Sequence, residues 1–204
     1  MMSGAGLARM AVVLIAVLVP AVAARAGAPT ERLRSSVDQV LHVVQSQPDT
    51  QARRAAIRKI ATGLFDFEET AKRALGPHWR DRTPQERREF VQLFTDLVEA
   101  AYVGRIERYE GEKVAYVGEQ VEGDEAVVRT NVISKQQEIP VNYRMRREPA
   151  GWRVYDVVIE GVSLIGNYRT QFNKIIQTSS YEELVERMRA KAFPAPEGGR
   201  RRRT

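Results

Sequence analysis

Cysteine is absent from the 204 residues of this chain, and histidine occurs only twice, at His42 and His78. The lack of cysteine excludes disulfides, thiolate nucleophiles, cysteine-based zinc sites and iron–sulfur ligation. A metal site would have to be built almost wholly from carboxylates, so we expect no metal and no other cofactor. The sequence also lacks a phosphate-binding glycine loop, a Walker motif and a paired-carboxylate signature. These absences leave few routes to catalysis.

Long hydrophobic runs are scarce too, and the clearest one, Met10 to Val19, lies near the amino terminus. Arg9 precedes this run and small residues follow it, which is typical of a secretory signal peptide. The run is too short to span a bilayer, which needs about 20 residues. Cleavage at Ala24-Arg25-Ala26, or alternatively at Ala21-Val22-Ala23, would release a mature protein outside the cytoplasm. We therefore interpret residues 1–26 as a leader, with a retained anchor as the alternative.

Excess positive charge is small and is concentrated at the two ends of the chain. Lys and Arg outnumber Asp and Glu by 32 to 26, and five of the six net charges lie in the leader and in residues 194–204. That final segment contains proline, glycine and Arg200 to Arg203, so we expect a disordered tail. Weak attraction to anionic head groups is its functional alternative. The domain between, residues 27–193, is nearly neutral, which argues against a nucleic-acid partner.

Helical spacing of apolar residues predicts four helices in the first half of the chain. We expect them at residues 29–48, 49–62, 66–76 and 83–109. Gly63 is expected to stop the second helix. Asp66 should cap the third, which Gly76-Pro77 should end, and Thr83 with Glu86 forms a capping box for the fourth. The fourth helix is long and rich in aromatic residues, so it should lie across something apolar.

Alternation of apolar and polar residues predicts strands after Gly111. We expect strands at Lys113–Val117, Ala126–Ser134, Glu138–Arg146 and Trp152–Glu160. Short turns between them indicate an antiparallel meander, and two more helices should begin at Ser163 and Ser180. The order predicts an α+β domain in which helices wrap a curved antiparallel sheet of about four strands.

Three side chains are candidates for catalysis, and each has a structural alternative. Ser163 lacks the second glycine of a nucleophile elbow, so it is better explained as a helix cap. Asp156 lies among apolar strand residues and could be a base with a raised pKa, or it could pair with Arg129 or Arg144. His78 could be a base or could make a structural hydrogen bond. The pairing and hydrogen-bonding interpretations are favoured.

The chain resembles the MlaC family, the toluene-tolerance or phospholipid-shuttle proteins of the Gram-negative periplasm. The resemblance spans about residues 33–190. It rests on residues 65–111, on Val141 to Met145 (VNYRM) and above all on Trp152 to Phe172 (WRVYDVVIEGVSLIGNYRTQF). The arginine tail is not part of the family pattern.

This resemblance implies an NTF2-like cone with added helices that encloses an apolar cavity for phospholipid acyl chains. It also implies a monomeric, non-enzymatic carrier in the periplasm. Its partners would be phospholipid, an outer-membrane lipoprotein–porin complex and the MCE-domain protein of an inner-membrane ABC transporter. The matching residues expected to line the cavity are Phe94, Leu97, Val98, Tyr102, Tyr143, Val157, Ile159, Val162, Ile165, Tyr168 and Phe172.

Two other functions stay open at this stage. A periplasmic enzyme on the same type of cone would use Asp156 or His78 as its base. A lipid-free adaptor would use its apolar stripes to bind a partner helix. The sequence does not indicate the direction of transport or the preferred head group.

Overall fold

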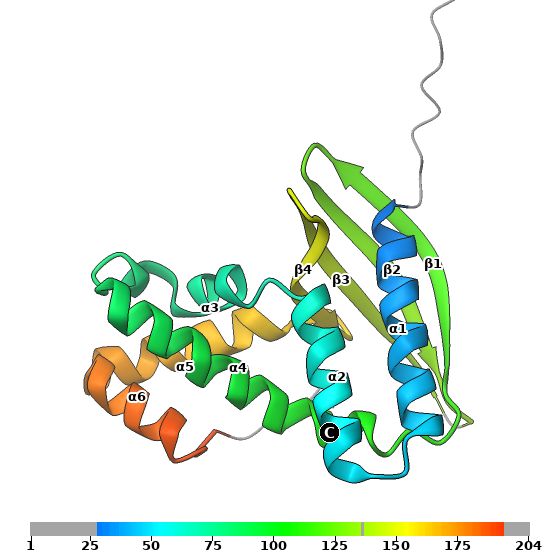
Figure 1. The fold of residues 1–204 in the computed structure, drawn as a ribbon. Helices are drawn as coiled ribbons and strands as arrows, with labels where there is room; N and C mark the ends of the chain where they lie inside the picture. The colour runs from blue at the N-terminus through cyan, green and yellow to red at the C-terminus, as the bar shows by residue number, and fades with distance from the viewer. Residues whose placement is uncertain (1–27, 136, 194–204) are drawn as a thin grey trace, which may run out of the picture.

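A computed structural model of the chain describes residues 28–135 and 137–193 (Figure 1). The predicted leader, residues 1–26, and the predicted tail, residues 194–204, lie outside them. The helices are α1 (Ala28–Ser46), α2 (Thr50–Leu64), α3 (Phe67–Leu75), the 3-10 helix η1 (Gly76–Trp79), α4 (Pro84–Ile106), α5 (Leu164–Thr178) and α6 (Tyr181–Arg189). The strands are β1 (Lys113–Glu122), β2 (Glu125–Ile133), β3 (Glu138–Glu148), β4 (Gly151–Ile159) and β5 (Val162–Ser163). The predicted α+β class is confirmed.

Capping side chains start the helices where the sequence predicts. Asp66 accepts a hydrogen bond from the Glu69 amide at 3.0 Å, and α3 ends at Gly76, whose φ is 62°. The capping box of α4 is reciprocal, because the Thr83 amide donates to the Glu86 carboxylate at 2.7 Å and the Glu86 amide donates to Thr83 Oγ1 at 3.3 Å. These bonds satisfy amides that the first helical turn leaves without partners.

The expected end of the second helix is wrong. We expected Gly63 to stop it, but α2 continues through Gly63 to Leu64. The helix ends because Phe65 is extended, with φ −90° and ψ 142°, and forms a bridge with Val154 of β4. The Asp66 amide donates to the Val154 carbonyl at 2.9 Å beside this bridge. A tertiary contact, rather than the flexibility of glycine, therefore sets the boundary.

The sheet is an antiparallel meander in the order β1-β2-β3-β4-β5, as predicted, with a short fifth strand added. β5 has two residues and pairs with the end of β4. β1 is longer than expected: a register shift between Tyr116 and Gly118 interrupts the alternation, yet the strand continues to Glu122. Because the bulge breaks the alternation of apolar and polar residues, a pattern of period two does not predict the second half of β1.

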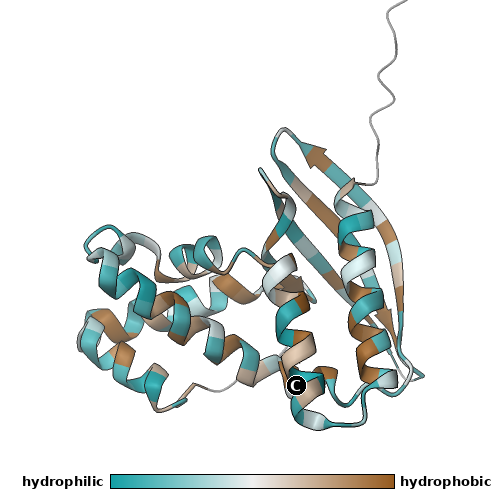
Figure 2. Ribbon diagram, in the orientation of Figure 1, coloured by the Kyte–Doolittle hydropathy of each residue, from teal (hydrophilic) through white to brown (hydrophobic). Residues whose placement is uncertain are grey.

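The helices fall into two groups around the sheet (Figure 1). α1 and α2 form a hairpin that contacts β1, β2 and β4, while α3, α4, α5 and α6 form a second group that reaches the sheet through β4 and β5. No described helix is both long enough and apolar enough to cross a membrane. Figure 2 shows hydrophobic residues concentrated in the second half of α1, which leads into the turn to α2, and in stretches of the strands beside it.

Two hydrophobic clusters correspond to these groups. The larger one fills the space among α3, η1, α4, α5 and α6 and is centred on Phe90, Phe94, Tyr168 and Phe172. Phe94 meets Tyr168 and Phe172 edge to face, with the Phe94 and Tyr168 centroids 5.2 Å apart at 89°, while Phe90 and Phe94 are stacked. Such pairs add about 0.5–1.5 kcal/mol beyond their buried area. The smaller cluster joins α1 and the end of α2 to the sheet.

Candidate functional site

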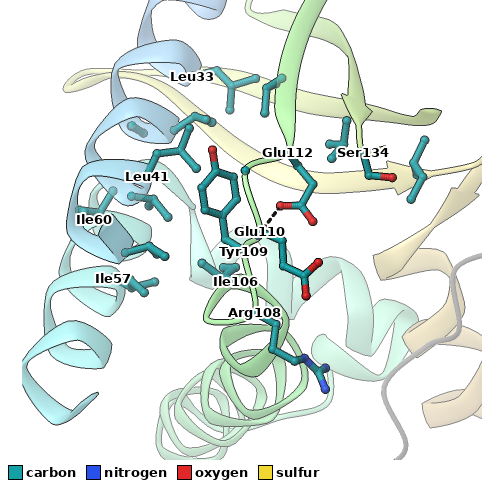
Figure 3. Close-up of a pocket in the computed structure, with 18 of the residues that line it drawn as sticks. Leu33, Leu41, Ile57, Ile60, Ile106, Arg108, Tyr109, Glu110, Glu112 and Ser134 are labelled. Carbon is teal, nitrogen blue, oxygen red and sulfur yellow. Dashed lines mark hydrogen bonds between the residues drawn. The ribbon is translucent and has the colours of Figure 1, made fainter. Parts of the chain in front are cut away.

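An apolar cavity of about 770 Å³ lies between the α1–α2 hairpin, the end of α4 and the first three strands (Figure 3). Its volume is within the range of about 300–1,000 Å³ that is common for ligand sites. The apolar lining residues are Leu33, Val37, Val40, Leu41, Val44, Ile57, Ile60, Ala61, Leu64, Phe65, Ile106, Val114, Val132 and Ile139.

Helical periodicity places two walls of this cavity. On α1, Val37, Leu41 and Val44 are spaced four and three residues apart, which puts them on one face. On α2, Ile57 and Ala61 are separated by one turn and turn toward the same space. Figure 3 shows Leu41, Ile57 and Ile60 projecting from the two helices into the cavity. The hairpin thus lines the cavity with apolar residues from both of its helices.

The sheet forms the third wall because the register brings apolar residues into a row. Val114 of β1 pairs with Val132 of β2, and Val132 pairs with Ile139 of β3. Cross-strand neighbours lie on the same face of a sheet. Four residues on from Ile139, Tyr143 lines the same side. The row makes a continuous hydrophobic wall across three strands.

The wall carries no ionised group at neutral pH. Burial, with a smaller contribution from nearby Tyr116, raises the pKa of Tyr143 to about 12. Its phenol therefore stays protonated and neutral. Tyr109, from the segment after α4, lies in the cavity with its hydroxyl directed toward α1 (Figure 3).

Ionic contacts hold α2 against α4 beside the cavity. Arg54 donates to both carboxylate oxygens of Glu107, at 2.9 and 3.0 Å, and Arg53 lies 3.9 Å from the same carboxylate. The hydrogen bond from Arg54 lowers the pKa of Glu107. One turn further along, Arg58 pairs with Glu99. The hairpin is anchored on this side mainly by charge.

Polar contacts hold α1 against β1. The amide and hydroxyl of Thr30 both donate to Glu119, at 2.8 and 2.5 Å. The guanidinium of Arg34 lies 4.2 Å from the ring centroid of Tyr116, a cation–π distance. The hairpin is thus attached at both flanks, and the cavity lies beneath it.

The candidate catalytic groups are engaged in structural contacts. The buried carboxylate of Asp156 accepts hydrogen bonds from Arg144 at 3.2 Å, from Ser163 Oγ at 2.7 Å and from the Ile165 amide at 3.2 Å. Pairing with Arg144 is therefore confirmed. Ser163 caps α5 through the Gly166 amide at 2.9 Å, which confirms its predicted structural role.

His78 lies in η1, where its Nε2 is 2.9 Å from Asn173 Oδ1, which matches the predicted structural hydrogen bond. His42, on α1, is exposed. Among the described residues, no group of three or more His, Asp or Glu side chains is placed to hold a metal ion.

Eleven residues were expected to line a cavity. Of these, Tyr143 lines the cavity beneath the α1–α2 hairpin. The others lie in or beside the two hydrophobic clusters or near the end of the sheet. Those in or against the helical cluster are Phe94, Leu97, Val98, Tyr102, Ile165, Tyr168 and Phe172. Val157 packs against the cluster under α1, Ile159 is at the end of β4, and Val162 is 40% exposed. Ligand contact by these ten residues stays a prediction.

Sequence reasoning missed the contribution of the α1–α2 hairpin to the cavity. The signal was present, because Leu33, Val37, Val40, Leu41 and Val44 form a clear stripe. Periodicity shows that this stripe is covered, but it does not show whether another helix covers it fully. The stripe lines a cavity because of how the hairpin is placed over the sheet, which the sequence pattern does not show.

The fold and the site together define a class: an α+β domain whose antiparallel sheet and helical hairpin surround an apolar cavity. A family model described as MlaC protein matches residues 34–190. The chain therefore belongs to the MlaC family, which confirms the resemblance inferred from its sequence.

Two relatives are informative. The intermembrane phospholipid transport system binding protein MlaC of Haemophilus influenzae is 22% identical over 191 residues, covering 88% of this chain and 89% of that protein. A solved structure of the phospholipid-binding protein from Ralstonia solanacearum, in complex with a phospholipid, superposes with a TM-score of 0.74 at 25% identity. That match covers 80% of this chain and 96% of the other.

Proposed function

We propose that this protein is a phospholipid carrier that holds acyl chains in the cavity beneath the α1–α2 hairpin. The observation that carries the proposal is an apolar cavity of about 770 Å³ in a chain of the MlaC family. The phospholipid in the Ralstonia structure supports the same ligand class. Tyr143 and the apolar residues of the hairpin and the sheet are the proposed tail contacts.

The physics of lipid transfer explains why such a protein needs an apolar space. Each buried methylene contributes about 0.8 kcal/mol, so two tails of about 30 methylenes in total would cost about 24 kcal/mol to expose to water. A bilayer and a dry cavity offer the tails similar surroundings, so transfer between them is nearly balanced. Net direction must then come from partner proteins rather than from this chain.

The finer proposal concerns the compartment and the partners. The predicted signal peptide and the family point to the periplasm. There the protein would carry lipid between an outer-membrane lipoprotein–porin complex and the MCE-domain component of an inner-membrane ABC transporter. A catalytic function has less support, because Asp156 is hydrogen-bonded to Arg144, Ser163 and the Ile165 amide.

Filling the cavity tests the proposal without adding charge. Ala61 of α2 lines the cavity, whereas Ala55 of the same helix is exposed. We expect Ala61→Trp to occupy tail space and to lower the phospholipid that co-purifies from the periplasm severalfold, as measured by native mass spectrometry.

The matched control is Ala55→Trp, which makes the same change on the exposed face of α2. It should keep the phospholipid content of the parent protein. Circular dichroism should show both variants folded. Equal lipid content in both variants would place the tails elsewhere, and a parent protein without lipid after gentle purification would contradict the carrier itself.

A further inference from the structure

The cavity is lined by charged side chains as well as by apolar ones. Arg108, Glu110 and Glu112 come from the segment between α4 and β1, and Lys135 comes from the turn between β2 and β3. Figure 3 shows the carboxylates of Glu110 and Glu112 next to each other and Arg108 beside them, all away from Leu41 and Ile60. We call these four charged residues the rim.

Local geometry keeps the two carboxylates on the same side. The Glu110 amide donates to Glu112 Oε2 at 2.8 Å, which closes the segment over Gly111. Gly111 has φ 99°, a conformation that residues with a Cβ rarely adopt. The chain therefore turns sharply between the two glutamates, and both side chains reach the cavity.

The two rim cations differ from the arginines around them. Within the part of the chain that the structure describes, neither Arg108 nor Lys135 takes part in an ion pair, and both are exposed. By contrast, Arg54 and Arg58 on the nearby α2 helix are paired with Glu107 and Glu99. Arg108 and Lys135 are thus available to an anion at the cavity.

The balance of charge at the rim indicates the type of head group. Two cations and two carboxylates give the rim no net charge. An anionic head group could use the cations, but it would leave the carboxylates without a partner. A head group with both a phosphate and an ammonium could satisfy both signs at once, and charge-assisted hydrogen bonds to phosphate and carboxylate are the stronger kind.

We propose that the rim is a head-group site that favours zwitterionic phospholipids carrying an amine over anionic ones. Arg108 and Lys135 face the phosphodiester, and Glu110 and Glu112 face the ammonium. This inference rests on the proposed carrier function, since the tails must occupy the cavity for the head group to reach the rim.

Competitive loading from vesicles tests the preference. The full mature protein is incubated with vesicles of equal phosphatidylethanolamine and phosphatidylglycerol, re-isolated, and its bound lipids are quantified by mass spectrometry. The parent protein should be enriched in phosphatidylethanolamine. Glu110→Gln with Glu112→Gln should shift the lipid ratio toward phosphatidylglycerol by about threefold to fivefold, as expected for exposed charge pairs. Glutamine at 112 can still accept the bond from the 110 amide.

The matched control is Glu68→Gln with Glu186→Gln, which makes the same change in net charge at exposed positions on α3 and α6. It should leave the ratio unchanged. The head-group site would be overturned if the loaded parent protein held the two lipids in the same ratio as the vesicles, or if both double variants shifted this ratio equally. Either result would leave the carrier function intact. A parent protein that takes up no lipid would instead contradict the carrier.

A final measurement tests whether the rim binds a lipid head group or a free anion. Inorganic phosphate in excess over lipid should leave the loaded ratio unchanged, because both lipids carry the same phosphodiester and a competing phosphate would weaken both alike. A ratio that moves with phosphate would identify the rim as a site for a free anion and would also overturn the proposal.

Discussion

At the scale of single residues, Asp156 has the structural role that the sequence favoured, and the structure adds further partners to it. The favoured prediction was a pair with an arginine, and the carboxylate also joins two further elements. It binds Arg144 of β3, Ser163 of β5 and the first turn of α5. These contacts tie the start of α5 to the sheet, and Asp156 is only 4% exposed.

We predict that Asp156→Asn destabilises the protein without affecting lipid binding directly. The amide cannot accept all three bonds, and it leaves Arg144 unpaired. The expected loss in the free energy of unfolding is about 1–3 kcal/mol, measured by urea denaturation. Asp124→Asn is the control, because the Asp124 side chain is 78% exposed and its ion pair with Arg147 is long, at 3.7 Å. Equal effects in the two variants would show that Asp156 has no joining role.

At the scale of elements, α4 illustrates how one helix can serve two regions. Its aromatic stripe packs against α5 and α6, where Phe90 and Phe94 meet Phe172. Its last residue, Ile106, lines the cavity. The aromatic stripe therefore packs into the helical cluster, and the end of the helix lies at the cavity.

Leu97 allows the two interpretations of α4 to be separated. It is 4% exposed within the helical cluster. We predict that Leu97→Ala lowers the free energy of unfolding by about 2–5 kcal/mol. The folded variant should nevertheless retain its phospholipid, as measured by native mass spectrometry.

The companion variant is Leu41→Ala, at a partly buried position on the cavity wall. It should weaken lipid retention more and stability less than Leu97→Ala does. If the folded Leu97→Ala protein is the one that loses lipid, the tails extend into the helical cluster, as the family resemblance alone suggested.

At the scale of the whole molecule, the cavity results from an incomplete cover. The α3–α6 group buries its aromatic residues within itself, so it does not fill the space under α1 and α2. The hairpin is attached at its flanks by the Glu107 and Glu119 contacts. Leu33 and Leu64 pack against the sheet in the smaller cluster, but the cavity keeps an open volume between the hairpin and the sheet, which a bound lipid tail would fill under the proposed function.

A ligand that completes a core should stabilise the fold. Binding to the native state alone adds about 2.7 kcal/mol when free ligand is at 100 times its dissociation constant. We therefore predict a higher Tm for the phospholipid-loaded protein than for the delipidated protein, measured by calorimetry. Ala61→Trp should show little difference between the two preparations. An unchanged Tm for a demonstrably loaded parent protein would contradict tail binding in this cavity.

Much of the local structure could be predicted because its causes are local. The helix starts at Asp66 and Ser163 follow from capping, and the meander follows from alternation and short turns. The predictions failed where distant residues act: Gly63 does not end α2, because Phe65 reaches β4, and β1 continues past its bulge.

The amino-acid sequence by itself determined the class of the fold, the lack of cysteine chemistry, the near-neutral charge of the central domain and the family of the protein. Tertiary structure alone decided which apolar residues form a core and which line a cavity. The physical reason is that periodicity reports only that a face avoids water. Whether Leu97 or Leu41 meets a neighbouring side chain or an open space depends on how the helices are placed over the sheet.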